Sequence, residues 1–124
     1  MATKGYIKPT ESELEILQIL WARKQATVRE VHEKLSVWKQ SGYTTTLKLM
    51  QIMYEKGLVT RDASRRVHIY KPDLDKDRAE TELVGKMVNG IFGGSPGKLI
   101  LRALGTSKPS KEEIEEIKKM LNQF

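Results

Sequence analysis

The sequence predicts a mainly α-helical chain of the α+β class, in which three helices and a two-stranded hairpin precede a second helical region. Three observations predict this order. Apolar residues recur at helical spacing in several segments, two short β-forming runs flank a polar turn, and the residue pattern changes after Pro72. We therefore expect two domains, residues 1–72 and residues 73–124.

The first two predicted helices each begin at a capping box, in which a Thr and the Glu three residues later hydrogen-bond each other's backbone N–H groups. Thr10 and Glu13 form the first box, and Thr27 and Glu30 form the second. Helical spacing predicts that the buried residues of these helices are Leu14, Ile16, Leu17, Leu20, Trp21, Val28, Val31 and Leu35.

A third helix is predicted from Thr44 to Lys56, because Gly57 is the expected C-terminal stop. Its buried residues are expected to be Thr46, Leu47, Met50, Met53 and Tyr54. The β-forming runs 58–61 and 67–70 follow, and the polar residues between them predict a hairpin with a basic tip, which ends at Pro72.

After Pro72 the chain is predicted to form a helix over residues 75–91, a short helix over 99–104 that Gly105 ends, and a last helix that starts at a capping box. A fragment of this size buries little surface alone, so its apolar faces need a partner, either a second chain or the first domain. We expect a homodimer, with these contact residues: Leu83, Val84, Met87, Val88, Ile91, Leu101, Leu104, Ile117 and Leu121.

Basic residues are concentrated in the first domain. Residues 1–72 hold 13 Lys and Arg against 7 Asp and Glu, whereas residues 73–124 hold 9 of each, so the whole net charge of +6 lies in the first part. Such a basic half is typical of a surface that meets phosphates, although a solvated basic surface is an equal alternative from charge alone.

Three helices followed by a hairpin with a basic tip are the layout of a winged helix-turn-helix, in which the third helix enters the major groove of DNA. The exposed face of that helix and the hairpin tip predict the DNA-binding residues Tyr43, Thr44, Thr45, Lys48, Gln51, Arg65 and Arg66. Lys can contact guanine or a phosphate, and the amide of Gln matches adenine.

Several other classes of function are disfavoured. The absence of cysteine excludes disulfides, thiolate metal sites and thiol catalysis. His32 and His68 stand in different predicted elements without a carboxylate cluster, and no nucleophile, base and orienting group occur together. We expect neither an enzyme nor a metal or cofactor site.

No apolar run approaches the ~20 residues of a membrane span, and the polar start predicts a cytoplasmic protein without membrane insertion.

Three segments together resemble the penicillinase-repressor family (the BlaI, MecI and CopY type). They are residues 43–59, the opening Glu13-Leu14-Glu15-Ile16-Leu17 with Trp21, and residues 67–72. The resemblance implies a homodimeric transcriptional repressor on a palindromic operator of double-stranded DNA. It places Thr44, Thr45 and Lys48 on the recognition helix, and Arg65 and Arg66 on the wing.

The family also suggests how repression could be relieved. Its β-lactamase-regulating members are inactivated by proteolysis of the dimerisation domain, in a system with a membrane-bound sensor protease. The bond cut in those members joins Asn and Phe, whereas this chain has Arg102-Ala103 at the equivalent place. The copper-responsive members bind metal through cysteines, which this chain lacks. A winged-helix protein-interaction module and a ligand-responsive DNA-binding regulator are the alternative functions.

Overall fold

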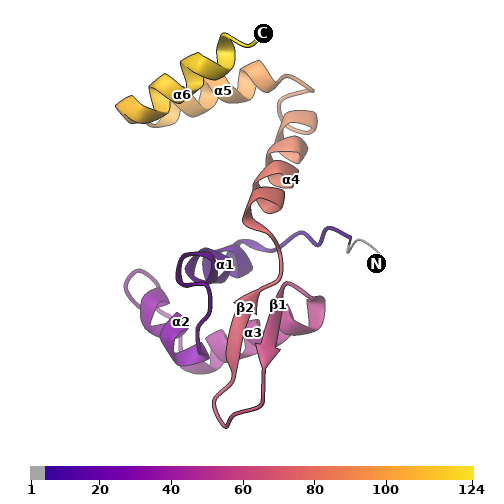
Figure 1. The fold of residues 1–124 in the computed structure, drawn as a ribbon, viewed down its shortest axis with the longest axis vertical. Coiled ribbons are helices and arrows are strands. Elements are labelled where there is room, and N and C mark those ends of the chain that lie inside the picture. The colour runs from indigo at the N-terminus through magenta and orange to yellow at the C-terminus, as the bar shows by residue number, and fades with distance from the viewer. Residues whose placement is uncertain (1–4) are drawn as a thin grey trace. The chain divides into compact units, whose positions relative to one another are not determined.

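The computed structural model describes residues 5–124 (Figure 1). Its elements are α1 (Glu11–Arg23), α2 (Val28–Leu35), α3 (Tyr43–Lys56), β1 (Val59–Asp62), β2 (Ile69–Pro72), α4 (Lys76–Asn89), α5 (Pro96–Thr106) and α6 (Lys111–Leu121). This order confirms the predicted α+β class, with three helices and a hairpin followed by helices. The chain divides into two compact units after Glu80.

The helix starts follow the capping pattern of the sequence. At α1 the Thr10 hydroxyl accepts from the Glu13 N–H at 3.2 Å, and the Glu13 carboxylate accepts from the Thr10 N–H at 2.8 Å. The same reciprocal pair, Thr27 with Glu30, starts α2. Because each pair satisfies backbone donors that a helix leaves open, these starts are encoded locally.

The two strands form an antiparallel hairpin, in which Val59 lies opposite Pro72 and Asp62 opposite Ile69. The hairpin is tied to the helices by Ala26 and Tyr70, whose backbone groups exchange two hydrogen bonds of 3.0 and 2.8 Å. This bridge fixes the middle of β2 beside the turn between α1 and α2, while the tip of the hairpin projects from the helices (Figure 1).

One core fills the space between α1, α2, α3 and the hairpin. Its members are apolar side chains that are nearly or completely buried: Ile16, Leu17, Ile19, Leu20, Ala26, Val28, Val31, Leu35, Met50, Met53, Leu58, Val59, Tyr70, Leu74 and Ala79. Tyr54 was expected to be buried but is 40% exposed, because its ring lies against a guanidinium of the hairpin and not in this core.

The first compact unit includes the segment that follows the hairpin. Leu74 and Ala79 are buried in the core of the first unit, and the indole N–H of Trp21 donates to the Leu74 carbonyl at 2.9 Å. The segment after the hairpin therefore packs with the first unit, and the division falls within α4.

The second unit has a different character, because no residue from 81 to 124 is buried. The short apolar helix is longer than predicted. Ser95 caps α5 through its hydroxyl and Pro96 occupies its first turn, so α5 starts three residues before Leu99. Gly105 does not end α5, which continues to Thr106. The capping box of Ser110 and Glu113 starts α6 as expected.

Candidate nucleic-acid interface

The third helix has one buried face and one exposed face. Thr46, Met50 and Met53 are buried against the core. The predicted contact residues lie on the other side, where Thr44, Thr45, Lys48 and Gln51 are exposed and Tyr43 is 41% exposed. A duplex could therefore meet this face without any rearrangement of the core.

The start of α3 is electrostatically different from the starts of α1, α2 and α6. Gly42 caps α3 without a side-chain hydrogen bond, and the first turn contains no acidic residue. The other three helices carry Glu in their first turns. Since the N-terminal end of a helix carries partial positive charge, the start of α3 favours an approaching phosphate, and no local carboxylate neutralises it.

A groove of about 480 Å³ separates α3 from the hairpin and the start of α2. Its lining residues are Thr27, Val28, Arg29, Tyr43, Leu47, Gln51, Arg61, Arg66, Val67, His68 and Tyr70. Three arginines, one from α2, one from β1 and one from the turn of the hairpin, thus line the same groove. The groove brings together the predicted residues Tyr43, Gln51 and Arg66, while Thr44, Thr45, Lys48 and Arg65 are exposed outside its lining.

Aromatic contacts hold Tyr43 at the edge of this groove. Its ring meets the His32 ring edge-on, with centroids 5.8 Å apart, and the Arg29 guanidinium carbon lies 5.7 Å from its centroid. The Nδ1 atom of His32 is also 3.0 Å from the hydroxyl of buried Thr46. These contacts join α2 to the first turns of α3, and so fix the angle at which α3 is presented.

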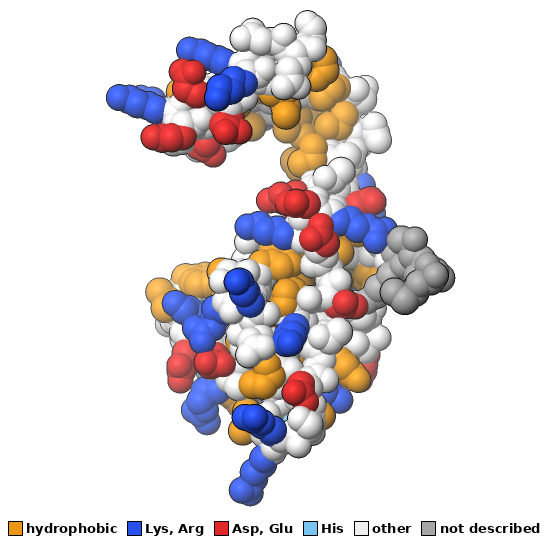
Figure 2. All heavy atoms as spheres, viewed as in Figure 1, with side chains coloured by type: hydrophobic (Ala, Val, Ile, Leu, Met, Phe, Trp, Pro, Cys, Tyr) orange, Lys and Arg blue, Asp and Glu red, His pale blue; other side chains and the backbone are white. Residues whose placement is uncertain are grey.

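The tip of the hairpin is shaped by Asp62. Its carboxylate accepts from the Ser64 N–H at 2.9 Å, which stabilises the turn. Hydrogen bonds from Ser64, together with the positive charges of Arg65 and Lys71, hold the pKa of Asp62 below its ordinary value. Arg65 and Arg66 are exposed beside this turn. Figure 2 shows Lys and Arg side chains spread over the visible face of the first unit, with one projecting at the hairpin tip.

Two arginines of the groove, Arg29 and Arg61, were not among the predicted DNA-binding residues. Arg29 stands in the first turn of α2, two residues after the capping Thr27. Arg61 stands two residues after Val59 on the same strand, so strand alternation places both on one face. The alternation was available in the sequence, but it does not reveal which face of the strand meets α3.

Within residues 5–124, no group of three or more His, Asp or Glu side chains is placed to hold a metal ion. In the same part of the chain, no helix combines the length and the apolar character needed to cross a bilayer.

Comparisons with known proteins agree with this geometry. The family model of the penicillinase repressor matches residues 9–123. The penicillinase repressor of Staphylococcus aureus is 23% identical over 124 residues, which is 100% of this chain and 98% of the relative. The transcriptional regulator BlaI of Mycobacterium tuberculosis is 37% identical over 81 residues, covering 64% of this chain and 56% of the relative.

Among solved structures, the DNA-binding domain of the repressor BlaI is similar to this chain with a TM-score of 0.53 and 23% identity, over 60% of this chain and 90% of that one. The monomeric form of Bacillus licheniformis BlaI, solved in complex with the blaP half-operator, gives a TM-score of 0.52 at 23% identity. These likenesses confirm the winged-helix fold. Since the family model spans nearly the whole sequence, the chain belongs to the penicillinase repressor family.

Proposed function

We propose that this chain is a cytoplasmic transcriptional repressor without catalytic activity, which binds a palindromic DNA operator as a homodimer. The observation that carries the proposal is the groove, where the exposed face of α3 and a basic hairpin meet around three arginines. In the proposed complex α3 enters the major groove and the hairpin lies on the backbone as a wing.

The side chains of α3 suit the two tasks of such a helix. Thr44 and Thr45 stand in its first turn, where their hydroxyls and the helix end favour phosphate. Lys48 and Gln51 follow on the same exposed side, where they can reach base edges. Arg65 and Arg66 add phosphate contacts from the wing.

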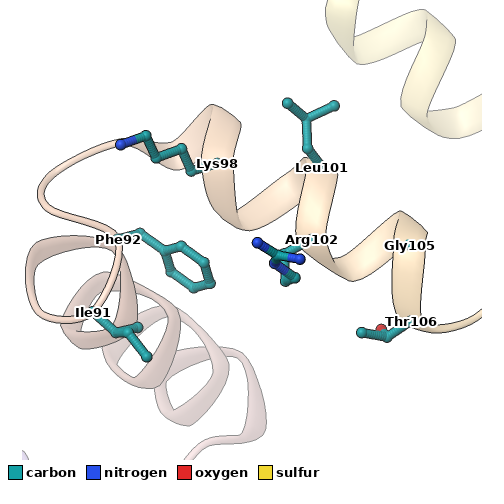
Figure 3. A pocket seen from close by; sticks show the side chains of 7 residues that line it. All are labelled: Ile91, Phe92, Lys98, Leu101, Arg102, Gly105 and Thr106. Atoms are coloured by element: carbon teal, nitrogen blue, oxygen red, sulfur yellow. The ribbon is translucent and has the colours of Figure 1, made fainter.

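The surface of the second unit supports dimerisation. None of the nine predicted contact residues is buried, and the large side chains of Ile91 and Leu101 are 82% and 73% exposed. A hollow of about 880 Å³ is lined by Ile91, Phe92, Lys98, Leu101, Arg102, Gly105 and Thr106. Figure 3 shows the Phe92 ring directed into it.

So much exposed apolar surface favours association with a second copy over a free monomer in water. Two winged helices in one dimer would each read one half of the operator. Binding of the second half-site is then intramolecular, which raises the overall affinity. Symmetry of the dimer requires symmetry of the operator, so the proposal includes a palindromic site.

Relief of repression by proteolysis of the C-terminal region, through a membrane-bound sensor protease, completes the proposal. Arg102 and Ala103 are exposed on α5, in the middle of the proposed dimer surface. A cut in this region would separate apolar residues on either side of it. The dimer would then weaken, and operator affinity would fall with it.

Selection of bound sequences from a library of random duplexes, with the full chain as bait, tests the function. We expect a palindrome whose half-sites are centred about one helical turn apart, or a multiple of it. Sedimentation of the free protein should give twice the mass of one chain. Enrichment of no sequence, with no salt-dependent affinity for duplex DNA, would refute the repressor and favour a protein-interaction module.

A further inference from the structure

The wing strand β1 carries an arginine that points inward. Val59 is buried and Arg61 is half-buried, whereas Thr60 and Asp62 are exposed, so Arg61 shares the inner face with Val59. Its guanidinium carbon lies 4.1 Å from the centroid of the Tyr54 ring. This stack links the middle of the strand to the last turns of α3.

The charge of Arg61 is not neutralised by an anion in the described part of the chain. Its Nε atom is buried and has no hydrogen-bond partner, and its guanidinium has no carboxylate partner in residues 5–124. The cations Arg23, Lys39 and Lys56, in contrast, each pair with a glutamate at 2.8 Å. A half-buried cation without an anion is costly, so this arrangement favours a negative ligand from outside the chain.

The position of Arg61 indicates which ligand that is. Arg61 lines the groove together with Gln51 from α3 and Arg66 from the wing. We propose that Arg61 binds a backbone phosphate of duplex DNA and that Tyr54 holds the guanidinium ready for this contact. The inference rests on the proposed function and adds to it a contact residue and a positioning residue.

Stacking gives this arginine an advantage over the arginines of the wing tip. A planar guanidinium can give two parallel hydrogen bonds to a phosphate, but a mobile side chain loses rotamer freedom when it does so. Against the Tyr54 ring, much of that freedom is already lost before DNA arrives. Arg65 and Arg66 are exposed and have no stacking partner among the described residues.

The test measures affinity for a mixed-sequence duplex over a range of salt concentrations, with variants of the full chain. Arg61→Ala should lower the slope of log affinity against log salt by about one unit, because one phosphate contact is lost. Arg61→Lys should keep the slope but bind several-fold more weakly, since an ammonium offers neither the stack nor two parallel hydrogen bonds. Tyr54→Leu should also weaken binding several-fold with an unchanged slope, and Tyr54→Phe should bind like the natural chain.

Lys34→Ala is the matched control, because it removes one exposed cation of the same unit that lies outside the groove. Its slope should equal that of the natural chain. Tyr54→Leu should have no further effect in the Arg61→Ala background, because its role acts through Arg61. Thermal unfolding of each variant by circular dichroism reports folding, and Arg61→Lys and Tyr54→Phe keep the test usable if Arg61→Ala does not fold.

An unchanged slope for Arg61→Ala overturns the inference, as does equal weakening by Tyr54→Leu with and without Arg61. A loss of stability with full DNA affinity would also overturn it, because the stack would then serve the fold alone. If the natural chain itself binds no duplex, the proposed function fails. If the natural chain binds and Arg61→Ala binds equally well, only the role of Arg61 fails.

Discussion

Glu13 is a buried carboxylate that connects the start of α1 to the end of α3, and replacing it by Gln tests how strongly this connection stabilises the fold. The side chain is 2% exposed. One of its oxygens accepts from the Thr10 N–H at 2.8 Å, and its two oxygens accept from the Lys56 ammonium at 3.0 and 2.8 Å. Gln keeps the shape and an oxygen for Thr10, but it loses the charge that faces Lys56.

Hydrogen bonds to charged groups contribute about 1.5–3 kcal/mol each to stability. The Lys56 side chain is 37% exposed, so it regains water when the carboxylate is removed, and the loss falls at the low end. We therefore expect Glu13→Gln to reduce the free energy of unfolding by about 1.5 kcal/mol at neutral pH. Urea unfolding followed by tryptophan fluorescence measures this, at fixed protein concentration because a dimer is stabilised by mass action.

Glu15→Gln is the matched control. Glu15 lies on the same helix and accepts from Lys39 at 2.8 Å and from the Trp38 indole at 3.0 Å, but it is only partly buried. An ion pair in contact with water contributes about 0–1 kcal/mol, so this substitution should cost clearly less. Equal losses for the two variants would refute the argument that burial makes the Glu13 contact strong.

The loss of stability that Glu13→Gln causes relative to the natural chain should depend on pH. Burial raises the pKa of Glu13, but the hydrogen bonds from Lys56 and Thr10 outweigh burial and hold that pKa below its ordinary value of 4.5. Because the folded chain favours the ionised form, the stabilisation is complete above that ordinary value and disappears as the pH falls through the lower, folded pKa. The difference in stability between the natural chain and Glu13→Gln should therefore shrink in acid, and a constant difference would contradict the shift.

Four further variants test other parts of the molecule. Lys48→Ala should cost about 1–3 kcal/mol of binding to the selected operator if Lys48 reads a base, and an equal loss on every duplex in a gel-shift series would assign it to phosphate. The double variant Arg65→Ala with Arg66→Ala should lower the slope of log affinity against log salt by about two units. An unchanged slope would show that the wing tip does not contact DNA. Met50→Ala, at a fully buried position, should lower the free energy of unfolding by about 2–5 kcal/mol in urea titrations, and a negligible loss would contradict its place in the core. Val84→Asp should give a monomer in size-exclusion chromatography. An intact dimer would contradict the proposal that α4 takes part in the dimer interface.

Features that depend on neighbours in the sequence could be predicted well. The three capping boxes each need only two residues three apart, so Thr10, Thr27 and Ser110 marked the starts of α1, α2 and α6. The glycine that ends α3 is similarly local, because Gly57 adopts a φ of 88°, which other residues rarely tolerate. The resemblance to the family was confirmed, as was the winged-helix fold.

Features that depend on contacts between distant residues could not be predicted. Helical spacing put Tyr54 on the buried face, but the hairpin places a guanidinium over its ring and leaves it 40% exposed. The residue pattern changes at Pro72, yet the core extends to Ala79, because the segment after the hairpin folds back onto the helices. The inward direction of Arg61 follows from which face of the hairpin meets α3, and this is a property of the folded unit.

The distribution of aromatic residues determines what spectroscopy can observe in this protein. Trp21, which donates to Leu74, and the exposed Trp38 both lie in the first unit, and so do all four tyrosines. The aromatic residues of the second unit are Phe92 and Phe124, which emit weakly. Intrinsic fluorescence therefore follows only the winged helix, whereas far-ultraviolet circular dichroism also follows α5 and α6. Titrations recorded with the two probes would coincide only if both units lose their structure in one cooperative transition.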